Sequence, residues 1–281
     1  MYDPHAEYAA IPAINWSSLK PLAESPLAFR YAQSHPREDT DALFFGRALH
    51  CAVLEPDKFH SLYVIAPDFG DLRAVQGRTT KEEGKANKER RNEWRAANAN
   101  KIPLDAEDGY RIQFMSEAIR NHRAAWAAIQ GATEQTIQWN EPDFGLACKA
   151  RLDILGIGVR DLKTANDVSP RGFGNAAAKY LYHGMAAWYH DGAIAAGRCA
   201  SPDLPLLIAT QNCPPWDVAV YRVNDEAMKV GRALYRRLVR RLVECTNAEW
   251  WPGVAPEILP LQLPYHTLNP DTHNDFDSED F

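Results

Sequence analysis

Apolar side chains recur with a helical period through the first 130 residues. In "TDALFFGRALHCAVLEP" the apolar residues fit a 3.6-residue repeat, Thr40 or Asp41 is placed to cap the helix start, and Pro56 ends it. Before it, "NWSSLKPLAESPLAFRYAQ" predicts a helical segment that Ser17 or Ser18 caps and a proline interrupts. Two further helices are predicted, an exposed and highly charged one over residues 80–99 and one over residues 105–130 that turns inward Ile112, Met115, Ile119 and Trp126.

After residue 130 the pattern changes to short alternating or apolar runs separated by Pro, Gly and Asn, which is typical of strands. Three such runs, "TEQTIQWN", "GLACKARLDIL" and "GVRDLKT", predict a β-meander. A helix over residues 172–191 follows, then strands in "LPLLIATQN" and "DVAVYRV", and a closing helix over residues 224–246. This order predicts a single α/β domain, residues 1–262, in which helices flank a central mixed sheet. The part up to residue 130 is its helical N-terminal segment, and residues 131–262 carry the sheet.

Composition is that of an ordinary globular protein. The 281 residues are 46% hydrophobic and 24% charged, which is enough to bury a sizeable core. We find no apolar run long enough for a membrane span and no secretory signal pattern, so we expect a cytoplasmic protein, in a bacterium or a phage-infected cell. The five cysteines are scattered and form no C-x-x-C pair, so we expect reduced thiols and neither a zinc nor an iron–sulfur site.

Charge is unevenly distributed along the chain. The net charge of −6 alone argues weakly against a nucleic-acid partner. Residues 73–95, however, carry eight lysines and arginines, and residues 229–241 carry six more. Residues 263–281 end in the acidic stretch "NPDTHNDFDSEDF", which is predicted to be a disordered tail. Basic surfaces are therefore available despite the negative total.

Charged residues interrupt the apolar run "RLDILGIGVRDLK". Asp161 and Lys163 are two apart, so their side chains leave the same face of a strand. A turn at Gly156 and Gly158 can bring Asp153 beside Asp161. Two close carboxylates repel each other unless a cation or a proton neutralises them, and Mg²⁺ prefers such oxygen ligands. The alternative is that Lys163 only forms an ion pair with one aspartate on a solvated face.

Four motifs resemble the PD-(D/E)XK nuclease superfamily, specifically its RecE/RecB-type branch of exonuclease VIII-like recombination nucleases. They are "INWSSLKPLAESPLAFRY", "ALFFGRALHCAVLEP", "CKARLDIL…VRDLKTANDVSP" and "YLYHGMAAWYHDGA", followed by the late strand "WDVAVYRV". The resemblance runs from residue 1 to about residue 255, and it implies a restriction-endonuclease-like core.

Carried over by position, the resemblance implies that His50, Asp153 and Asp161 are metal ligands, with the Leu162 carbonyl as a further one. Lys163 becomes the catalytic lysine, and acts with Asp153 and Asp161. The implied cofactor is Mg²⁺, with Mn²⁺ as a substitute. Taken alone, His50 is more often an ordinary helix histidine, although Gly46, one turn earlier, opens space beside its imidazole. Glu134 begins the first strand and is either an additional ligand or a solvated strand-end carboxylate.

The helix after the hairpin departs from the family pattern. The family usually has a Gln that contacts substrate phosphate four residues before a Tyr; here Met185 stands before Tyr189, and Met cannot donate that hydrogen bond. His183 is a candidate replacement. Tyr182 and Tyr189 share a helix face, and either pack in the core or reach the DNA backbone.

Residues 78–95, with Lys85 and Arg91, are either a solvated helix or a surface that follows phosphates.

The function implied is that of a metal-dependent exodeoxyribonuclease. It would degrade linear double-stranded DNA from its ends, leaving 5′-phosphates, in phage or prophage homologous recombination. The implied partners are DNA ends, a single-strand annealing protein and further copies of the chain in a ring. Two alternatives stay open: a DNA-end-binding protein whose nuclease has decayed, and a PD-(D/E)XK endonuclease.

Overall fold

A computed structural model describes residues 4–35, 38–199, 204–255 and 257–263. The predicted acidic tail, residues 263–281, lies outside the described residues except for Leu263. Within the described part of the chain, no helix combines the length and the apolar character needed to cross a membrane.

The centre of the fold is a five-stranded mixed sheet in the order β3-β4-β5-β6-β7. The strands are β3 (Ala132–Asn140), β4 (Ala147–Leu155), β5 (Val159–Ala165), β6 (Leu206–Gln211) and β7 (Val218–Arg222). The first three are antiparallel, which confirms the predicted meander, and β6 pairs in parallel with β5 and antiparallel with β7. The parallel pair requires a crossover, and the helices α9 (Pro170–Lys179) and α10 (Tyr182–Ala195) supply it.

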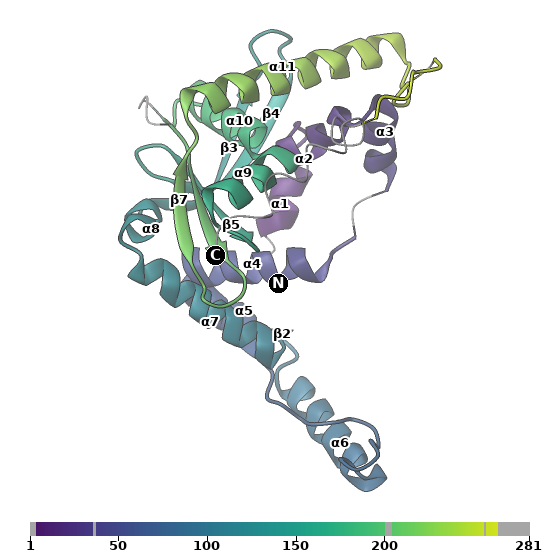
Figure 1. Ribbon diagram of the computed structural model, residues 1–281, viewed down its shortest axis with the longest axis vertical. Helices are drawn as coiled ribbons and strands as arrows, with labels where there is room; N and C mark the ends of the chain where they lie inside the picture. The colour runs from purple at the N-terminus through teal and green to yellow at the C-terminus, as the bar shows by residue number, and fades with distance from the viewer. Residues whose placement is uncertain (1–3, 36–37, 200–203, 256, 264–281) are drawn as a thin grey trace, which may run out of the picture.

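Helices cover both faces of this sheet (Figure 1). On one face α10 packs on β3, β4 and β5, and the long α11 (Asp225–Ala248) packs over α10. The main core forms here, around the fully buried Leu152, Trp188 and Met228. The other face is covered by α4 (Asp41–Leu54), α7 (Ala106–Asn121) and α8 (Arg123–Ala128). The predicted single α/β domain with a flanked mixed sheet is therefore confirmed.

The N-terminal helices are α1 (Pro4–Ala10), α2 (Trp16–Leu19), the 3-10 turn η1 (Lys20–Ala23) and α3 (Pro26–Ser34). Asn15, and not Ser17 or Ser18, caps α2: its side chain accepts the Ser18 N–H at 2.7 Å, while the Ser18 hydroxyl accepts the Asn15 N–H. Thr40 caps α4 as predicted.

Lys149 on β4 forms hydrogen bonds that join α1 to the sheet. Its side chain is buried on β4, and its Nζ donates to the carbonyl oxygens of Tyr8 (2.7 Å), Ala9 (3.2 Å) and Ile11 (2.8 Å). These carbonyls lie at the C-terminal end of α1, where the helix leaves its acceptors unpaired and favours a cation.

The segment that links α4 to α7 along the chain forms a helical arm that projects from the body of the protein (Figure 1). After α5 (Pro56–Leu62), the chain leaves through β1 (Tyr63–Ile65), forms α6 (Lys81–Ala97) and returns through β2 (Ile102–Leu104), which pairs with β1. Thr80 and Glu83 form a capping box at the start of α6. The predicted exposed, charged helix is confirmed.

Two predicted helices are each broken in the structure. His122 has an extended backbone and caps α8 through its Nδ1, which accepts the Ala125 N–H at 3.1 Å. The break resets the helical phase, so Ala125 is buried and Trp126 is 49% exposed, contrary to the prediction that Trp126 faces inward. Similarly, Leu181, with φ +59°, separates α9 from α10.

Candidate active site

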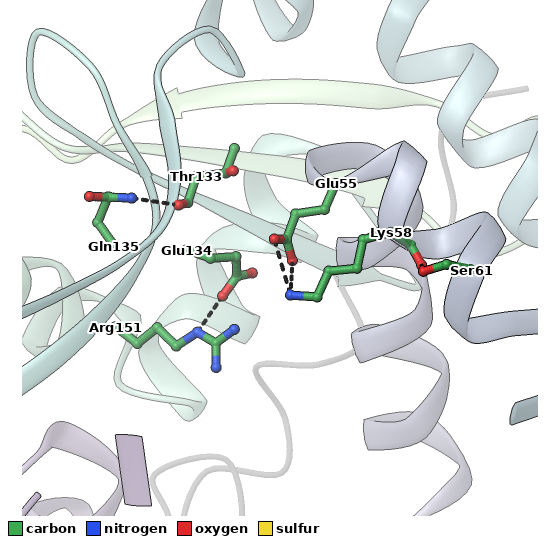
Figure 2. Close-up of polar contacts among 7 residues, drawn as sticks. All are labelled: Glu55, Lys58, Ser61, Thr133, Glu134, Gln135 and Arg151. Atoms are coloured by element: carbon green, nitrogen blue, oxygen red, sulfur yellow. Dashed lines mark hydrogen bonds and ion pairs between the residues drawn. The ribbon is translucent and has the colours of Figure 1, made fainter. Parts of the chain in front are cut away.

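A cavity of about 620 Å³ lies between the helices α4 and α5 and the strands β3, β4 and β5. The strands contribute the polar side chains of Glu134, Arg151, Asp153 and Lys163. The helices contribute, among others, His50, Glu55 and Lys58. Figure 2 shows Glu134 and Arg151 on the strand side of this region and Glu55 with Lys58 on the helical side. Most of the residues singled out in the sequence therefore reach one cavity.

The hairpin of β4 and β5 brings together Asp153, Asp161 and Lys163. The pairs Leu155↔Val159 and Ile154↔Arg160 fix a register whose next step sets Asp153 opposite Asp161. The Asp153 Oδ2 accepts a hydrogen bond from the backbone N–H of Leu162 at 2.9 Å, which joins the Asp153 side chain to β5. Asp161 and Lys163, on one strand face, form an ion pair. Lys163 Nζ also lies 3.5 Å from the Leu162 carbonyl oxygen.

Within the described part of the chain, His50, Glu134 and Asp153 form a group of atoms that could hold a metal ion. One atom of each lies within 4.8 Å of the other two. The His50 Nδ1 is 3.5 Å from the Asp153 Oδ2. Gly46 and His50 are one turn apart on α4 and both line the cavity, so the glycine does leave space beside the imidazole. Asp161 is not part of this group and is held by Lys163 instead.

Glu134 adopts an unusual backbone conformation. Its φ is +54°, in the left-handed region that residues other than glycine rarely occupy, although the β3–β4 register is the same on both sides of it. Its carboxylate accepts a hydrogen bond from the Arg151 Nε, with a donor–acceptor distance of 2.5 Å. Such strain is frequent where a side chain must be aimed at a site. No feature of the surrounding residues predicts this conformation.

Burial and mutual repulsion shift the pKa values of the cluster. Burial raises the pKa of Asp153 and of Glu134, against the opposing effects of Lys163 and Arg151 respectively. Burial, with the repulsion of Asp153, raises the pKa of Asp161 to about 6 although Lys163 opposes it. For Lys163 burial acts to lower the pKa, but Asp161 and Asp153 outweigh it and the pKa is raised. The site thus holds a cationic lysine among carboxylates that resist ionising together.

The His50 imidazole is favoured in its neutral form. Burial and the nearby Lys163 cation lower its pKa, while Asp161 and Glu134 act in the opposite direction. A histidine must be neutral to ligate a metal. The donor set of one imidazole and two carboxylates, with the Leu162 carbonyl nearby, therefore fits a divalent cation that would relieve the repulsion among the acids.

The two tyrosines of α10 lie differently with respect to the site. Tyr182 lines the cavity, and Lys163 Nζ is 5.4 Å from its ring centroid. Tyr189 packs against the main core, and burial together with Asp161 and Asp153 raises its pKa well above 10. Met185 is 6% exposed and belongs to the main core. His183 does not line the cavity, and burial lowers its pKa.

Lys85 and Arg91 lie on the arm helix α6, outside the cavity. Lys85 is exposed and reaches Glu89 at 3.9 Å. Arg91 is half-buried, and its Nε is a buried atom with no hydrogen-bond partner among the described residues. The structure therefore does not bring these two cations next to the carboxylate cluster.

Sequence reasoning missed Arg151. It alternates with Asp153 and the buried Lys149 on β4, so period-2 alternation predicts that all three share one strand face. That signal was present in "CKARLDIL" but does not reveal that Arg151 pairs with a residue of the neighbouring strand.

A mixed sheet carrying an Asp-x-Lys pair beside an Asp on the preceding strand, with helices on both faces, is the PD-(D/E)XK-like fold. Residues 15–259 match the family described as "PDDEXK-like domain of unknown function (DUF3799)", and the chain belongs to that family. A search of curated proteins finds no match. Among solved structures, the chain is similar to a candidate exonuclease from Eubacterium rectale, with a TM-score of 0.59 and 13% identity over 96% of this chain and 99% of that one. At this identity the likeness concerns the fold.

Proposed function

We propose that this protein is a metal-dependent exodeoxyribonuclease that degrades linear double-stranded DNA from its ends. The observation that carries the proposal is the meeting of His50, Glu134, Asp153 and Lys163 in one cavity, with the buried Asp161 paired to Lys163 behind it. Membership of the PDDEXK-like family and the fold shared with a candidate exonuclease support it.

The residues present fit a divalent cation, with Mg²⁺ as the proposed cofactor and Mn²⁺ as a substitute. His50, Asp153 and Glu134 would hold it, and Asp161 and the Leu162 carbonyl are the remaining candidates from the sequence. When bound, such an ion polarises a phosphate oxygen and lowers the pKa of a coordinated water. Glu134 replaces Asp161 as the partner of His50 and Asp153 in this proposal because Asp161 is engaged by Lys163.

The protein's own groups would orient the reactants. Lys163 is cationic, half-buried and fixed by Asp161, so it can hold the attacking water or a phosphate oxygen at a defined place. Tyr182 lines the same cavity and can donate a hydrogen bond to the DNA backbone. Hydrolysis adds water across the phosphodiester bond, and the product strand ends in a 5′-phosphate.

DNA outside the cavity is proposed to contact the arm. Residues 73–95 carry the eight cations noted in the sequence, and α6 is exposed along most of its length (Figure 1). Phosphates are attracted to such a surface in a salt-dependent manner. Of the two cations proposed there, Lys85 is the accessible one and Arg91 is partly packed within the arm. The wider setting, phage or prophage recombination with an annealing protein and a ring of copies, remains a proposal from the resemblance.

The test is a time course on end-labelled linear duplex with Mg²⁺, with Mn²⁺ and with EDTA, beside covalently closed circular DNA. We expect metal-dependent loss of the linear substrate and no cutting of the circle. Cutting of the circle would make the protein an endonuclease. Binding of the linear duplex with no cutting of either DNA would make it an end-binding protein, and the nuclease proposal would be wrong.

A further inference from the structure

Part of the cavity wall is apolar, although the site beside it is highly charged. On α4, Ala42 lies two turns before His50 and Gly46 lies one turn before it. All three residues therefore lie on the same face of the helix, which lines the cavity. Leu43, Tyr63 and Ile102 also line the cavity, and Leu43 and Ile102 are each 38% exposed. Exposed apolar residues that face a cavity next to catalytic groups are typical of ligand pockets, and a volume of about 620 Å³ is within their usual range.

Among the described residues, no contact requires a glycine at position 46. A Cβ at this position would meet nothing within 4 Å, and its φ is not in the left-handed region. By contrast, a Cβ on Gly184 would come within 2.4 Å of Trp16, and one on Gly192 within 2.6 Å of Trp139. Glycine is among the least favourable residues in a helix interior. Its presence in α4 therefore keeps space free in the cavity at some cost to the helix.

We infer that the wall formed by Ala42, Leu43, Gly46 and Ile102 is a nucleotide subsite, which receives the base and sugar of the terminal nucleotide of the strand being cut. The inference rests on the proposed nuclease function. In a terminal nucleotide, the sugar is attached directly to the phosphate and the base to the sugar. When that phosphate lies at the carboxylate cluster, the sugar and base must therefore lie beside the cluster, where the apolar wall is. Bases are held by packing against apolar and aromatic side chains, and Tyr63 adds an aromatic ring to the same cavity. Gly46 sets the room available to them.

The experiment uses Gly46→Ala and Gly46→Leu, with Gly174→Ala as the matched control. Gly174 is also inside a helix, α9, where a Cβ meets no described residue within 4 Å, but it does not line the cavity. Each variant is assayed on a linear duplex with intact ends and on one whose terminal nucleotides are abasic. Melting temperature and the Mn²⁺-induced rise in Tm are measured on the same preparations.

Both alanine variants should melt about 2–4 °C higher than wild type, because alanine is the better helix former. Only Gly46→Ala should lose kcat/KM on the intact duplex, by about tenfold, the effect of one misplaced methyl group in a pocket. Gly46→Leu should lose more. On the abasic duplex, where no base needs the space, both Gly46 variants should retain most of the wild-type rate, and their response to Mn²⁺ should be unchanged.

The outcomes separate the inference from the function on which it rests. A wild-type protein that cuts neither duplex in any metal overturns the nuclease proposal and the subsite with it. An active wild type with Gly46→Ala equal to Gly174→Ala on both duplexes overturns the subsite alone. Equal losses on the intact and the abasic duplex, or a lost Mn²⁺ response, would also overturn it, since the added group would then be disturbing the metal or phosphate positions.

Discussion

Replacing Glu134 by glutamine tests which carboxylates hold the metal. The sequence pointed to His50, Asp153 and Asp161, whereas the structure groups Glu134 with His50 and Asp153. Glutamine keeps the size of the side chain and can still accept the Arg151 hydrogen bond, but it removes the negative charge. We expect Glu134→Gln to weaken Mn²⁺ binding strongly and to leave the fold intact.

The magnitude follows from the compactness of the ligand group. Two unit charges about 4 Å apart interact by about 4 kcal/mol at an effective dielectric of about 20, and the three ligand atoms lie within 4.8 Å of one another. Loss of one charge is therefore enough to weaken affinity about 100-fold, or about 2.7 kcal/mol. At a Mn²⁺ concentration about 100 times the wild-type Kd, binding stabilises wild type by about 2.7 kcal/mol and raises Tm by about 5–10 °C. The variant at that concentration gains about 0.4 kcal/mol, or about 1 °C.

The assay is the Tm of wild type and variants with EDTA and with Mn²⁺. Glu55→Gln is the control, because Glu55 lines the same cavity but pairs with Lys58 at 3.2 Å and is outside the ligand group. It should keep the wild-type response. If Glu134→Gln keeps the full Mn²⁺-induced rise in Tm while Asp161→Asn loses it, Glu134 is not a metal ligand. The ligands would then be His50, Asp153 and Asp161, as expected from the sequence.

Three further outcomes are expected. Asp161→Ala should abolish hydrolysis of linear duplex without lowering Tm, because it removes one carboxylate from a like-charged cluster and frees Lys163 from its anchor; digestion at the wild-type rate would show that the site is misassigned. His50→Asn should weaken Mn²⁺ binding, with activity partly restored at high Mn²⁺ concentration; an early melting transition with unchanged Mn²⁺ affinity would make His50 a packing residue. Burial lowers the pKa of His190, which is only 3% exposed, below its ordinary value of 6.5. The folded state therefore favours the neutral ring, and stability is lost as pH falls below about 6.5, so the drop in Tm between about pH 7.5 and pH 5.5 should be smaller in His190→Leu than in wild type.

The strands and the β4–β5 hairpin could be predicted because their information is local. Alternation along β4 and β5, with a Gly-x-Gly turn between them, fixes which side chains share a face, and this places Asp161 beside Lys163. The cap of α4 by Thr40 is likewise set by a few neighbouring residues. The approach of His50 to Asp153 depends on how α4 packs on the sheet, so the sequence supported it only through a family resemblance.

What could not be predicted depends on single backbone positions and on neighbouring strands. The left-handed φ of Glu134 has no signature in a run such as "TEQTIQWN", and its pairing with Arg151 needs the register of β3 on β4. Trp126 was misplaced because one extended residue, His122, rotates the following turn away from the phase of α7. A helical period extrapolated through such a break assigns the wrong face.

The anchoring of α1 by Lys149 has a consequence for the order in which the molecule folds. The three carbonyls that Lys149 binds are separated from it by 138 to 141 positions along the chain. During synthesis, which proceeds from the N-terminus, the first helix emerges long before the ammonium group that will hold it. A seven-residue helix is marginal in water without tertiary contacts. Helix α1 therefore becomes fixed only after β4, the strand that carries Asp153, has taken its place in the sheet.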